Sequence, residues 1–121
     1  MLWTAINFLG RLLIALLFIP AGITKITGPK PFLAHMAEHR VPGALLPLVI
    51  VLEIGGGLLV LSGWQSRWAA LALAVFCVMT ALVFHLDLGD KVERTQFVKD
   101  LAIAGGLLAL ASYNGLTWPF G

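Results

Sequence analysis

The sequence predicts an all-α integral membrane protein: a bundle of four membrane-spanning helices with a short interfacial helix between the first two. Composition is the first reason, because 60% of the 121 residues are hydrophobic, 12% are charged and the mean hydropathy is +0.95. Soluble domains carry about 25% charged residues, enough to cover a surface that faces water. The second reason is that four apolar runs approach the roughly 20 residues that a helix needs to cross a bilayer.

The four apolar runs form one predicted domain that covers residues 1–121. They lie at about residues 4–23, 43–63, 67–86 and 97–116. Each run is apolar on every face, whereas a membrane β-strand alternates apolar and polar residues over about 10 positions. The runs are therefore predicted to be helices.

The connection between the first two runs contains "PKPFLAHMAEHRVPG", with prolines at both edges. In a helix, Phe32, Leu33 and Met36 share one face here, while Glu38 and His39 turn away from it. This pattern predicts a short helix that lies in the membrane interface.

The same segment contains "HMAEH", His35 to His39, which fits the H-x-x-E-H pattern of one group of zinc peptidases. Such an enzyme needs a stable helix, a third ligand and a walled cleft, so a short helix in a loop argues against a peptidase. A metal site that combines His35 or His39 with His85 or Asp87 stays open as an alternative. We predict no metal ligand and expect polar residues on an interfacial helix that covers the mouth of a cavity.

The basic residues predict the topology of the chain in the membrane. The first and third connections carry most of them: Lys25, Lys30, Arg40, Lys91 and Arg94. The opposite side has Arg67. The positive-inside rule then places the first and third connections in the cytoplasm and both termini outside. The basic residues form no patch of the kind that nucleic acid needs, so nucleic acid is not an expected partner.

Small residues predict close contacts between helices. "EIGGGLL" holds Gly55, Gly56 and Gly57, and "AIAGGLLALA" holds Gly105 and Gly106. Small residues let helix backbones approach each other in lipid. Packing within the bundle is the first interpretation, and a homodimer face is the second.

Ionisable residues inside the spans are the strongest functional signal, because such side chains are costly in lipid and mark sites of function. They are Arg11, Glu53, His85, Lys99 and Asp100, with Lys25 at the end of the first span. Depth counted at about 1.5 Å per residue puts Arg11 and Glu53 at similar levels on antiparallel helices. We therefore expect an Arg11–Glu53 ion pair that faces the interior of the bundle.

The remaining ionisable residues define a predicted cavity with Glu53 at its bottom. The cavity would open toward the first and third connections, where further polar residues gather: Lys25, His85, Lys99 and Asp100, with Asp87 and Asp90 at the mouth. Two simpler interpretations stay open. The long side chains near the membrane surface can extend to the interface, and His85 can be a buried imidazole bonded to a carbonyl.

Four stretches carry a family resemblance: "GRLLIALLFIPAGITKITGP", "VPGALLPLVIVLEIGGGLLVLSGWQSRWAALALAVF", "TALVFH" and "FVKDLAIAGGLLALA". They include the polar positions Arg11, Lys25, Glu53, His85 and Lys99. Together they resemble the DoxX family of small four-helix bacterial membrane proteins. Asp100 is a departure, since the family often has asparagine after the lysine.

The resemblance implies a protein of the bacterial inner membrane, with periplasmic termini on the topology above, and of oxidoreductase type. Members are similar to the small subunit of a thiosulfate:quinone oxidoreductase, and others are associated with sulfur metabolism or oxidative-stress defence. A buried Glu–Arg pair beside a histidine suits a quinone head group and the movement of its protons. The single Cys77, expected to be a small buried hydrophobic residue, cannot hold an iron–sulfur cluster, and no haem motif is present. The electrons would come from a partner subunit or a soluble donor.

We therefore expect an interior site for a quinone-like small molecule. The expected catalytic, proton-handling residues are Glu53 and His85, and the expected ligand-binding residues are Arg11, Lys25, Lys99 and Asp100. Two other functions stay open: a carrier or permease for a small anion such as a sulfur oxyanion, and a non-catalytic scaffold that stabilises a partner protein. Whether the chain is catalytic alone is also open.

Overall fold

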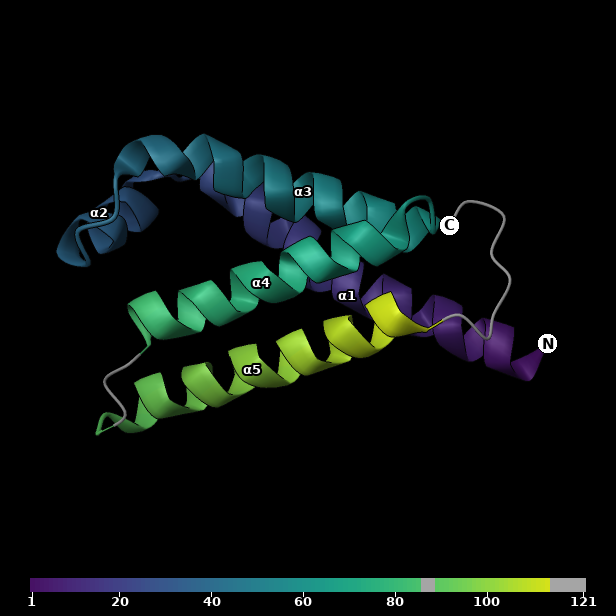
Figure 1. Cartoon of the computed structure of the whole chain (residues 1–121). Coiled ribbons are helices and arrows are strands. Elements are labelled where there is room, and N and C mark those ends of the chain that lie inside the picture. Colours follow the sequence, from purple (N-terminus) through teal and green to yellow (C-terminus); the bar gives the residue numbers. More distant parts are fainter. Residues whose placement is uncertain (86–88, 114–121) are drawn as a thin grey trace.

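The structure is a computed structural model that describes residues 1–85 and 89–113. These residues form helices joined by short connections, and no β-strand occurs among them (Figure 1). In chain order the elements are α1 (Leu2–Thr27), α2 (Lys30–Glu38), the 3₁₀ turn η1 (Gly43–Leu45), α3 (Leu46–Ser62), α4 (Ser66–Phe84) and α5 (Lys91–Ser112). The predicted all-α class is confirmed, and α2 is the short helix expected between the first two spans.

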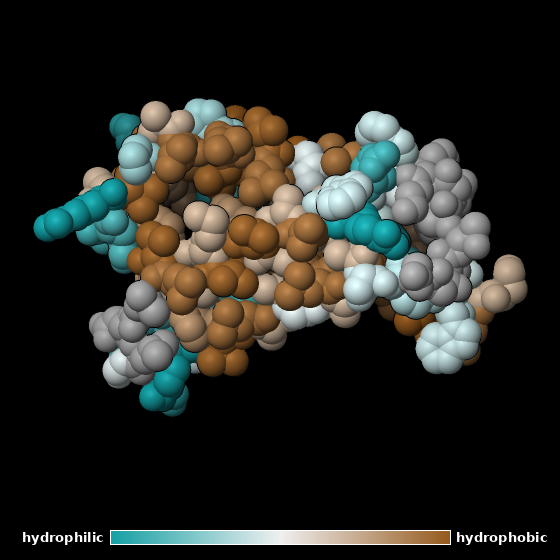
Figure 2. Space-filling model, in the orientation of Figure 1, coloured by the Kyte–Doolittle hydropathy of each residue, from teal (hydrophilic) through white to brown (hydrophobic). Residues whose placement is uncertain are grey.

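Three helices of the described part are long and apolar enough to cross a membrane: α1, α3 together with its 3₁₀ turn, and α4. α5 has 22 residues, but its first turns are charged and it also carries Lys99 and Asp100, so its crossing stays a prediction. Figure 2 shows hydrophobic side chains over the middle of the visible face and hydrophilic ones gathered toward its two ends. This distribution suits a chain whose middle contacts lipid.

α5 begins at Lys91 rather than at the predicted residue 97. The side chain of Asp90 explains the earlier start, because its Oδ1 accepts hydrogen bonds from the backbone N–H groups of Val92, at 2.8 Å, and Glu93, at 3.5 Å. A helix start leaves such N–H groups without intrahelical partners, and a carboxylate there stabilises the first turn. The predicted end at residue 116 lies outside the described residues.

The long helices form two antiparallel pairs. α1 packs along α3, α4 packs along α5, and contacts between α3 and α4 join the pairs (Figure 1). The fully buried side chains Val60, Leu73 and Leu107 lie where α3, α4 and α5 meet, and Cys77 is buried in the same cluster, as predicted. This apolar core holds the pairs together at the end away from α2.

Two glycines bring α1 and α3 into close contact. A Cβ atom on Gly22 would lie 2.5 Å from Cγ1 of Ile54, and one on Gly57 would lie 2.8 Å from Cγ1 of Ile19. Real side chains do not tolerate such distances, so both positions need glycine at this spacing of the helices. Gly57 fits the predicted packing role, and so does Gly56, where a Cβ would lie 3.1 Å from the Leu73 side chain of α4. A Cβ on Gly55, Gly105 or Gly106 would meet nothing within 4 Å.

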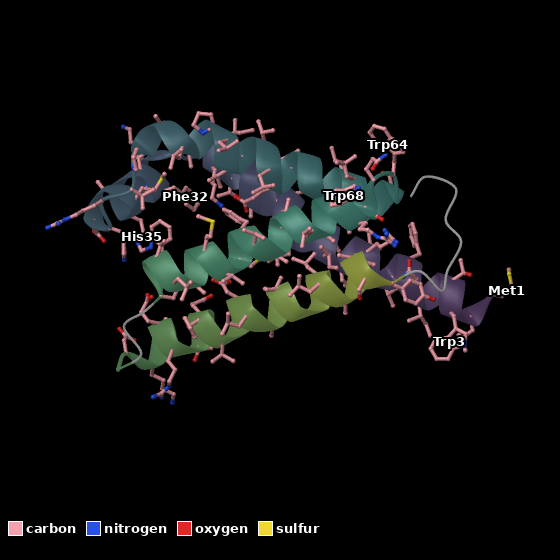
Figure 3. The ribbon with its side chains drawn as sticks, viewed as in Figure 1. Met1, Trp3, Phe32, His35, Trp64 and Trp68 are labelled. Carbon is pink, nitrogen blue, oxygen red and sulfur yellow. The ribbon has the colours of Figure 1, made fainter. Side chains whose placement is uncertain are left out.

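The two ends of the molecule carry different aromatic residues. Trp3, Trp64 and Trp68 are exposed at the end where α1 begins and α3 meets α4 (Figure 3). Phe32 and His35 lie on α2 at the opposite end. Exposed tryptophans near helix ends are typical of the membrane–water interface, so this end marks one boundary of the lipid-facing belt.

We predict that Gly22→Ala destabilises the protein by about 1–3 kcal/mol, because the added methyl group forces α1 away from α3. Unfolding by SDS in mixed micelles measures this change. Gly55→Ala is the matched control, since its methyl group meets no neighbour and alanine favours the helix by about 0.5–1 kcal/mol. Equal stability of the two variants would contradict the close α1–α3 contact.

Candidate functional site

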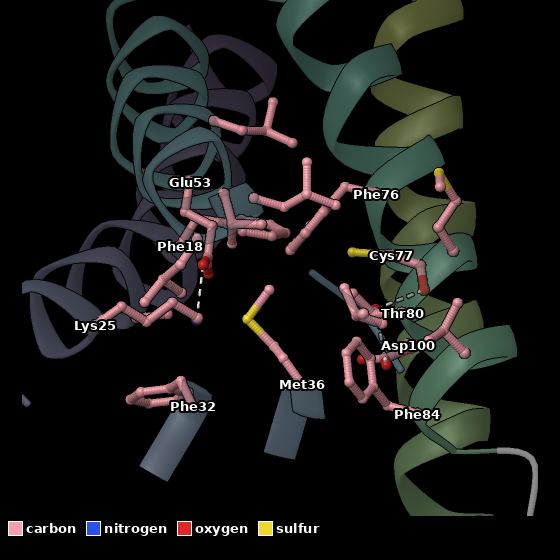
Figure 4. A pocket seen from close by; sticks show the side chains of 18 of the residues that line it. Phe18, Lys25, Phe32, Met36, Glu53, Phe76, Cys77, Thr80, Phe84 and Asp100 are labelled. Atoms are coloured by element: carbon pink, nitrogen blue, oxygen red, sulfur yellow. Dashed lines mark hydrogen bonds and ion pairs between the residues drawn. The ribbon is translucent and has the colours of Figure 1, made fainter. Parts of the chain in front are cut away.

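A cavity of about 760 Å³ lies between the two helix pairs at the α2 end of the molecule. Residues of α1, α2, α3, α4 and α5 all line it, and most of these side chains are apolar, among them Phe18, Met36 and Phe76 (Figure 4). Four elements hold its polar groups: α1 and α3 on one wall, and α4 with α5 on the other. The predicted cavity is thus present at the predicted end, but its lining is more apolar than expected.

The first polar group is an ion pair between α1 and α3. Nζ of Lys25 lies 2.7 Å from Oε1 of Glu53, and the two side chains are 16% and 5% exposed. Among the described residues, no donor makes a hydrogen bond of regular geometry to Oε1. The contact with Lys25 is therefore mainly electrostatic, and Oε1 can still accept a hydrogen bond from another group. A buried charge needs such a partner, because its desolvation costs several kcal/mol.

The expected Arg11–Glu53 ion pair is wrong. Arg11 is buried, but its Nε donates to Oδ1 of Asn7 at 2.6 Å and its Nη1 donates to the carbonyl oxygen of Val60 at 3.0 Å. Gly22, not Arg11, lies level with Glu53, and Arg11 precedes Gly22 by three turns, or about 16 Å along the helix. Lys25 follows Gly22 by less than one turn and therefore reaches Glu53. Arg11 also does not line the cavity.

The second polar group lies on the opposite wall, where α4 meets α5. Oδ2 of Asp100 lies 3.4 Å from Oγ1 of Thr80 and 3.7 Å from Nε2 of His85. The other ring nitrogen of His85, Nδ1, lies 2.8 Å from Oε2 of Glu93, to which it donates. His85 thus bridges two carboxylates. The Thr80 hydroxyl donates to the carbonyl oxygen of Cys77 at 2.9 Å and makes only the longer contact with Asp100. The interpretation of His85 as an imidazole bonded to a carbonyl is not supported.

Sequence reasoning missed Thr80 and Glu93. The apolar run that starts at residue 97 leaves Glu93 in the third connection, although Asp90 and Glu93 together form the D-x-x-E pattern of a helix start. That pattern would have placed Glu93 on the first turn of α5, next to the end of α4. Asp90 serves as the helix cap and does not line the cavity, and Asp87 lies outside the described residues.

Lys99 lines the cavity with Asp100 but is exposed. Within residues 1–85 and 89–113 it forms no ion pair. Its ammonium group therefore adds positive charge to the rim without neutralisation by a neighbouring described carboxylate.

α2 covers the cavity through side chains on one of its faces. Met36 is buried, the Phe32 ring lies 4.8 Å from Nζ of Lys25, and the rings of His35 and His39 lie 4.9 and 4.8 Å from the ring of Phe84 on α4. Aromatic and cation–π contacts of this kind are each worth about 0.5–1.5 kcal/mol. The expectation that "HMAEH" lies on a helix covering the cavity mouth agrees with this arrangement.

The arrangement suits proton exchange with a polar group held inside an apolar chamber. Glu53 on one wall and Asp100 on the other can each accept or release a proton, and the Lys25 ammonium group can donate a hydrogen bond. Figure 4 shows Glu53 and Asp100 on opposite sides of the cavity, with Met36 between them at the α2 side. A molecule held there would contact both polar groups at once.

A polytopic α-helical membrane protein with a ligand-sized internal cavity is the class that this fold and this cavity define. Residues 6–86 match the family model of DoxX. The chain is 46% identical over 101 residues to the inner membrane protein YqjF of Escherichia coli strain K12, a match that covers 84% of this chain and 78% of that protein. It is 30% identical over 110 residues to the inner membrane protein YphA of the same strain, covering 85% of this chain and 79% of that protein.

The chain therefore belongs to the DoxX family. The resemblance seen in the sequence is confirmed. No solved structure matches the chain.

We predict that Lys25→Met destabilises the protein by about 3 kcal/mol, because it leaves the Glu53 carboxylate buried without its cation. Glu53→Gln added to Lys25→Met should recover most of that loss, since no buried charge then remains. SDS unfolding of the two single variants and the double variant gives the coupling energy. If the loss of stability in the double variant equals the sum of the losses in the two single variants, the two side chains do not interact.

Proposed function

We propose that the cavity binds a small molecule with a polar head and an apolar body, and that this molecule is a quinone handled within an oxidoreductase system of the inner membrane. The observation that supports this is the placement of two hydrogen-bonding groups, Lys25–Glu53 and Thr80–Asp100–His85, on opposite walls of an otherwise apolar cavity. A quinone has two carbonyl oxygens on opposite sides of one flat ring, and each would meet one of these groups.

The size and lining of the cavity support the same class of ligand. Pockets for small molecules have volumes of roughly 300–1,000 Å³ and mostly apolar walls with a few polar groups, and this cavity has about 760 Å³. Phe18, Phe76 and Met36 offer flat or adaptable apolar surfaces to a ring. An isoprenoid tail would leave between the helix pairs toward the lipid.

Reduction of a quinone to a quinol takes up two electrons and two protons, and reoxidation releases them. In this proposal Glu53 and Asp100 transfer the protons, and Lys25 donates a hydrogen bond to one carbonyl oxygen while protonated Asp100 donates to the other. His85 with Glu93 passes protons to the end of α4. The electrons come from a partner subunit or a soluble donor. Arg11 is assigned a structural role in this scheme, through its bond to the carbonyl oxygen of Val60.

We further propose that the α2 end faces the cytoplasm of the cell and that the tryptophan end faces the periplasm. The excess of lysine and arginine in the connections at the α2 end supports this orientation. The named inner-membrane relatives support the location.

Labelling with a membrane-impermeant maleimide tests the orientation. The cysteine introduced by Lys30→Cys should react in inside-out vesicles and not in intact spheroplasts. The cysteine introduced by Thr4→Cys should react in intact spheroplasts and not in inside-out vesicles. The natural Cys77 is 4% exposed and serves as the unreactive background. Reaction of Lys30→Cys from the outside would reverse the proposed orientation.

Titration of the detergent-purified protein with a short-chain quinone tests the binding site. We predict that Glu53→Gln and Asp100→Asn each weaken the affinity by about tenfold or more, since each removes a charge-assisted partner worth roughly 1.5–3 kcal/mol. Glu38→Gln is the matched control, because Glu38 lies exposed on α2 and does not line the cavity.

The same titration separates the proposed function from anion transport. Unchanged quinone affinity in both Glu53→Gln and Asp100→Asn would remove these residues from the site and contradict the proposal. Binding of thiosulfate that is lost in Lys99→Met, with no binding of quinone by the wild type, would favour an anion carrier instead.

A further inference from the structure

The C-terminal end of α2 carries a cluster that the quinone proposal does not use. One ligand atom from each of His35, Glu38 and His39 lies within 4.8 Å of the other two. We propose that these three side chains bind a divalent transition-metal ion such as Zn²⁺. The proposal does not depend on quinone binding, and it departs from the sequence-based expectation of no metal ligand.

Helix geometry brings the three side chains together. Residues i, i+3 and i+4 lie on one side of a helix, and α2 is regular over His35 to Glu38, with His39 as its cap. The rings of His35 and His39 lie with their centroids 4.6 Å apart, and Nδ1 of His35 lies 3.9 Å from Oε2 of Glu38. The side chains are exposed enough to close by small rotations onto one ion, whose bonds to nitrogen and oxygen are about 2.0–2.2 Å long.

A second observation concerns the tautomer of neutral His39. Its Nδ1 lies 2.9 Å from the carbonyl oxygen of His35. A carbonyl oxygen only accepts hydrogen bonds, so Nδ1 carries the proton and Nε2 keeps the lone pair. Histidines that bind metals usually donate their other ring N–H to a carbonyl or carboxylate in this way, which fixes the ring and its tautomer.

The types of ligand indicate the type of ion. Two imidazoles and one carboxylate form the set that zinc uses in sites with one open position. Mg²⁺ and Ca²⁺ prefer shells made of oxygen ligands, so the cluster favours a transition metal. The metal site that the sequence left open paired these histidines with His85 or Asp87. His85 is instead bonded to Glu93 on α5.

The position of the cluster gives the ion a structural effect. His35 and His39 pack against Phe84 of α4, and His35 also lines the cavity. An ion that joins the two imidazoles and Glu38 would hold both rings as one unit against Phe84. Metal binding would therefore stabilise α2 over the cavity mouth.

Isothermal titration of the full chain in mild detergent, purified without a histidine tag, tests this site with Zn²⁺ alone. We expect one ion per chain for the wild type. Zn²⁺ binding should be weaker in each of three variants: His35→Gln, His39→Gln and Glu38→Gln. We expect a loss of affinity of at least about tenfold for the two histidine variants, because even the loss of a residue that only supports a metal ligand costs about that much. His85→Gln is the matched control and should bind like the wild type.

Hydrogen exchange gives a second readout on the same samples. Zn²⁺ should slow the exchange of backbone amides in α2 of the wild type and of His85→Gln, but not of His39→Gln. Circular dichroism checks that each variant is helical. No stoichiometric binding by the wild type, binding unchanged in both His35→Gln and His39→Gln, or binding lost in His85→Gln would each overturn the proposal.

Discussion

The buried contact between Lys25 and Glu53 constrains the rest of the structure. A charged carboxylate inside a membrane helix is costly without a partner, and here Lys25 and Glu53 meet at 2.7 Å between α1 and α3. The absent side chain of Gly22 lets α1 approach so closely that a Cβ there would lie 3.4 Å from Cβ of Glu53. The register of the first helix pair and the location of the charge therefore depend on each other.

The two ends of the bundle have separate roles. Val60, Leu73 and Leu107 fill the space between the helix pairs at the tryptophan end, so the pairs are fixed there. Toward α2 the same pairs enclose a cavity of about 760 Å³ instead of a packed core. The tightly packed side chains thus lie toward one end, and the polar groups gather around the cavity at the other. α2 closes that end through contacts of single side chains, not through a packed interface.

The sequence predicted the helices, the short helix α2 and the end at which the polar residues gather. It failed on the partner of Glu53, because counting depth from the predicted start of each helix does not reveal how two helices are shifted along each other. That shift is set by the contacts of Gly22 and Gly57, which only the packed structure contains. The link between His85 and Glu93 was missed for a similar reason, since α5 starts earlier than its apolar run.

The central claim is that the cavity holds a quinone, and native mass spectrometry of the protein released from its membrane tests it most directly. The wild type should carry one molecule of quinone mass, and Ala21→Phe, which places a ring in the cavity lining, should be released empty while still folded. A wild type that is empty and takes up no added quinone, or an Ala21→Phe variant that retains the same molecule, would contradict the account.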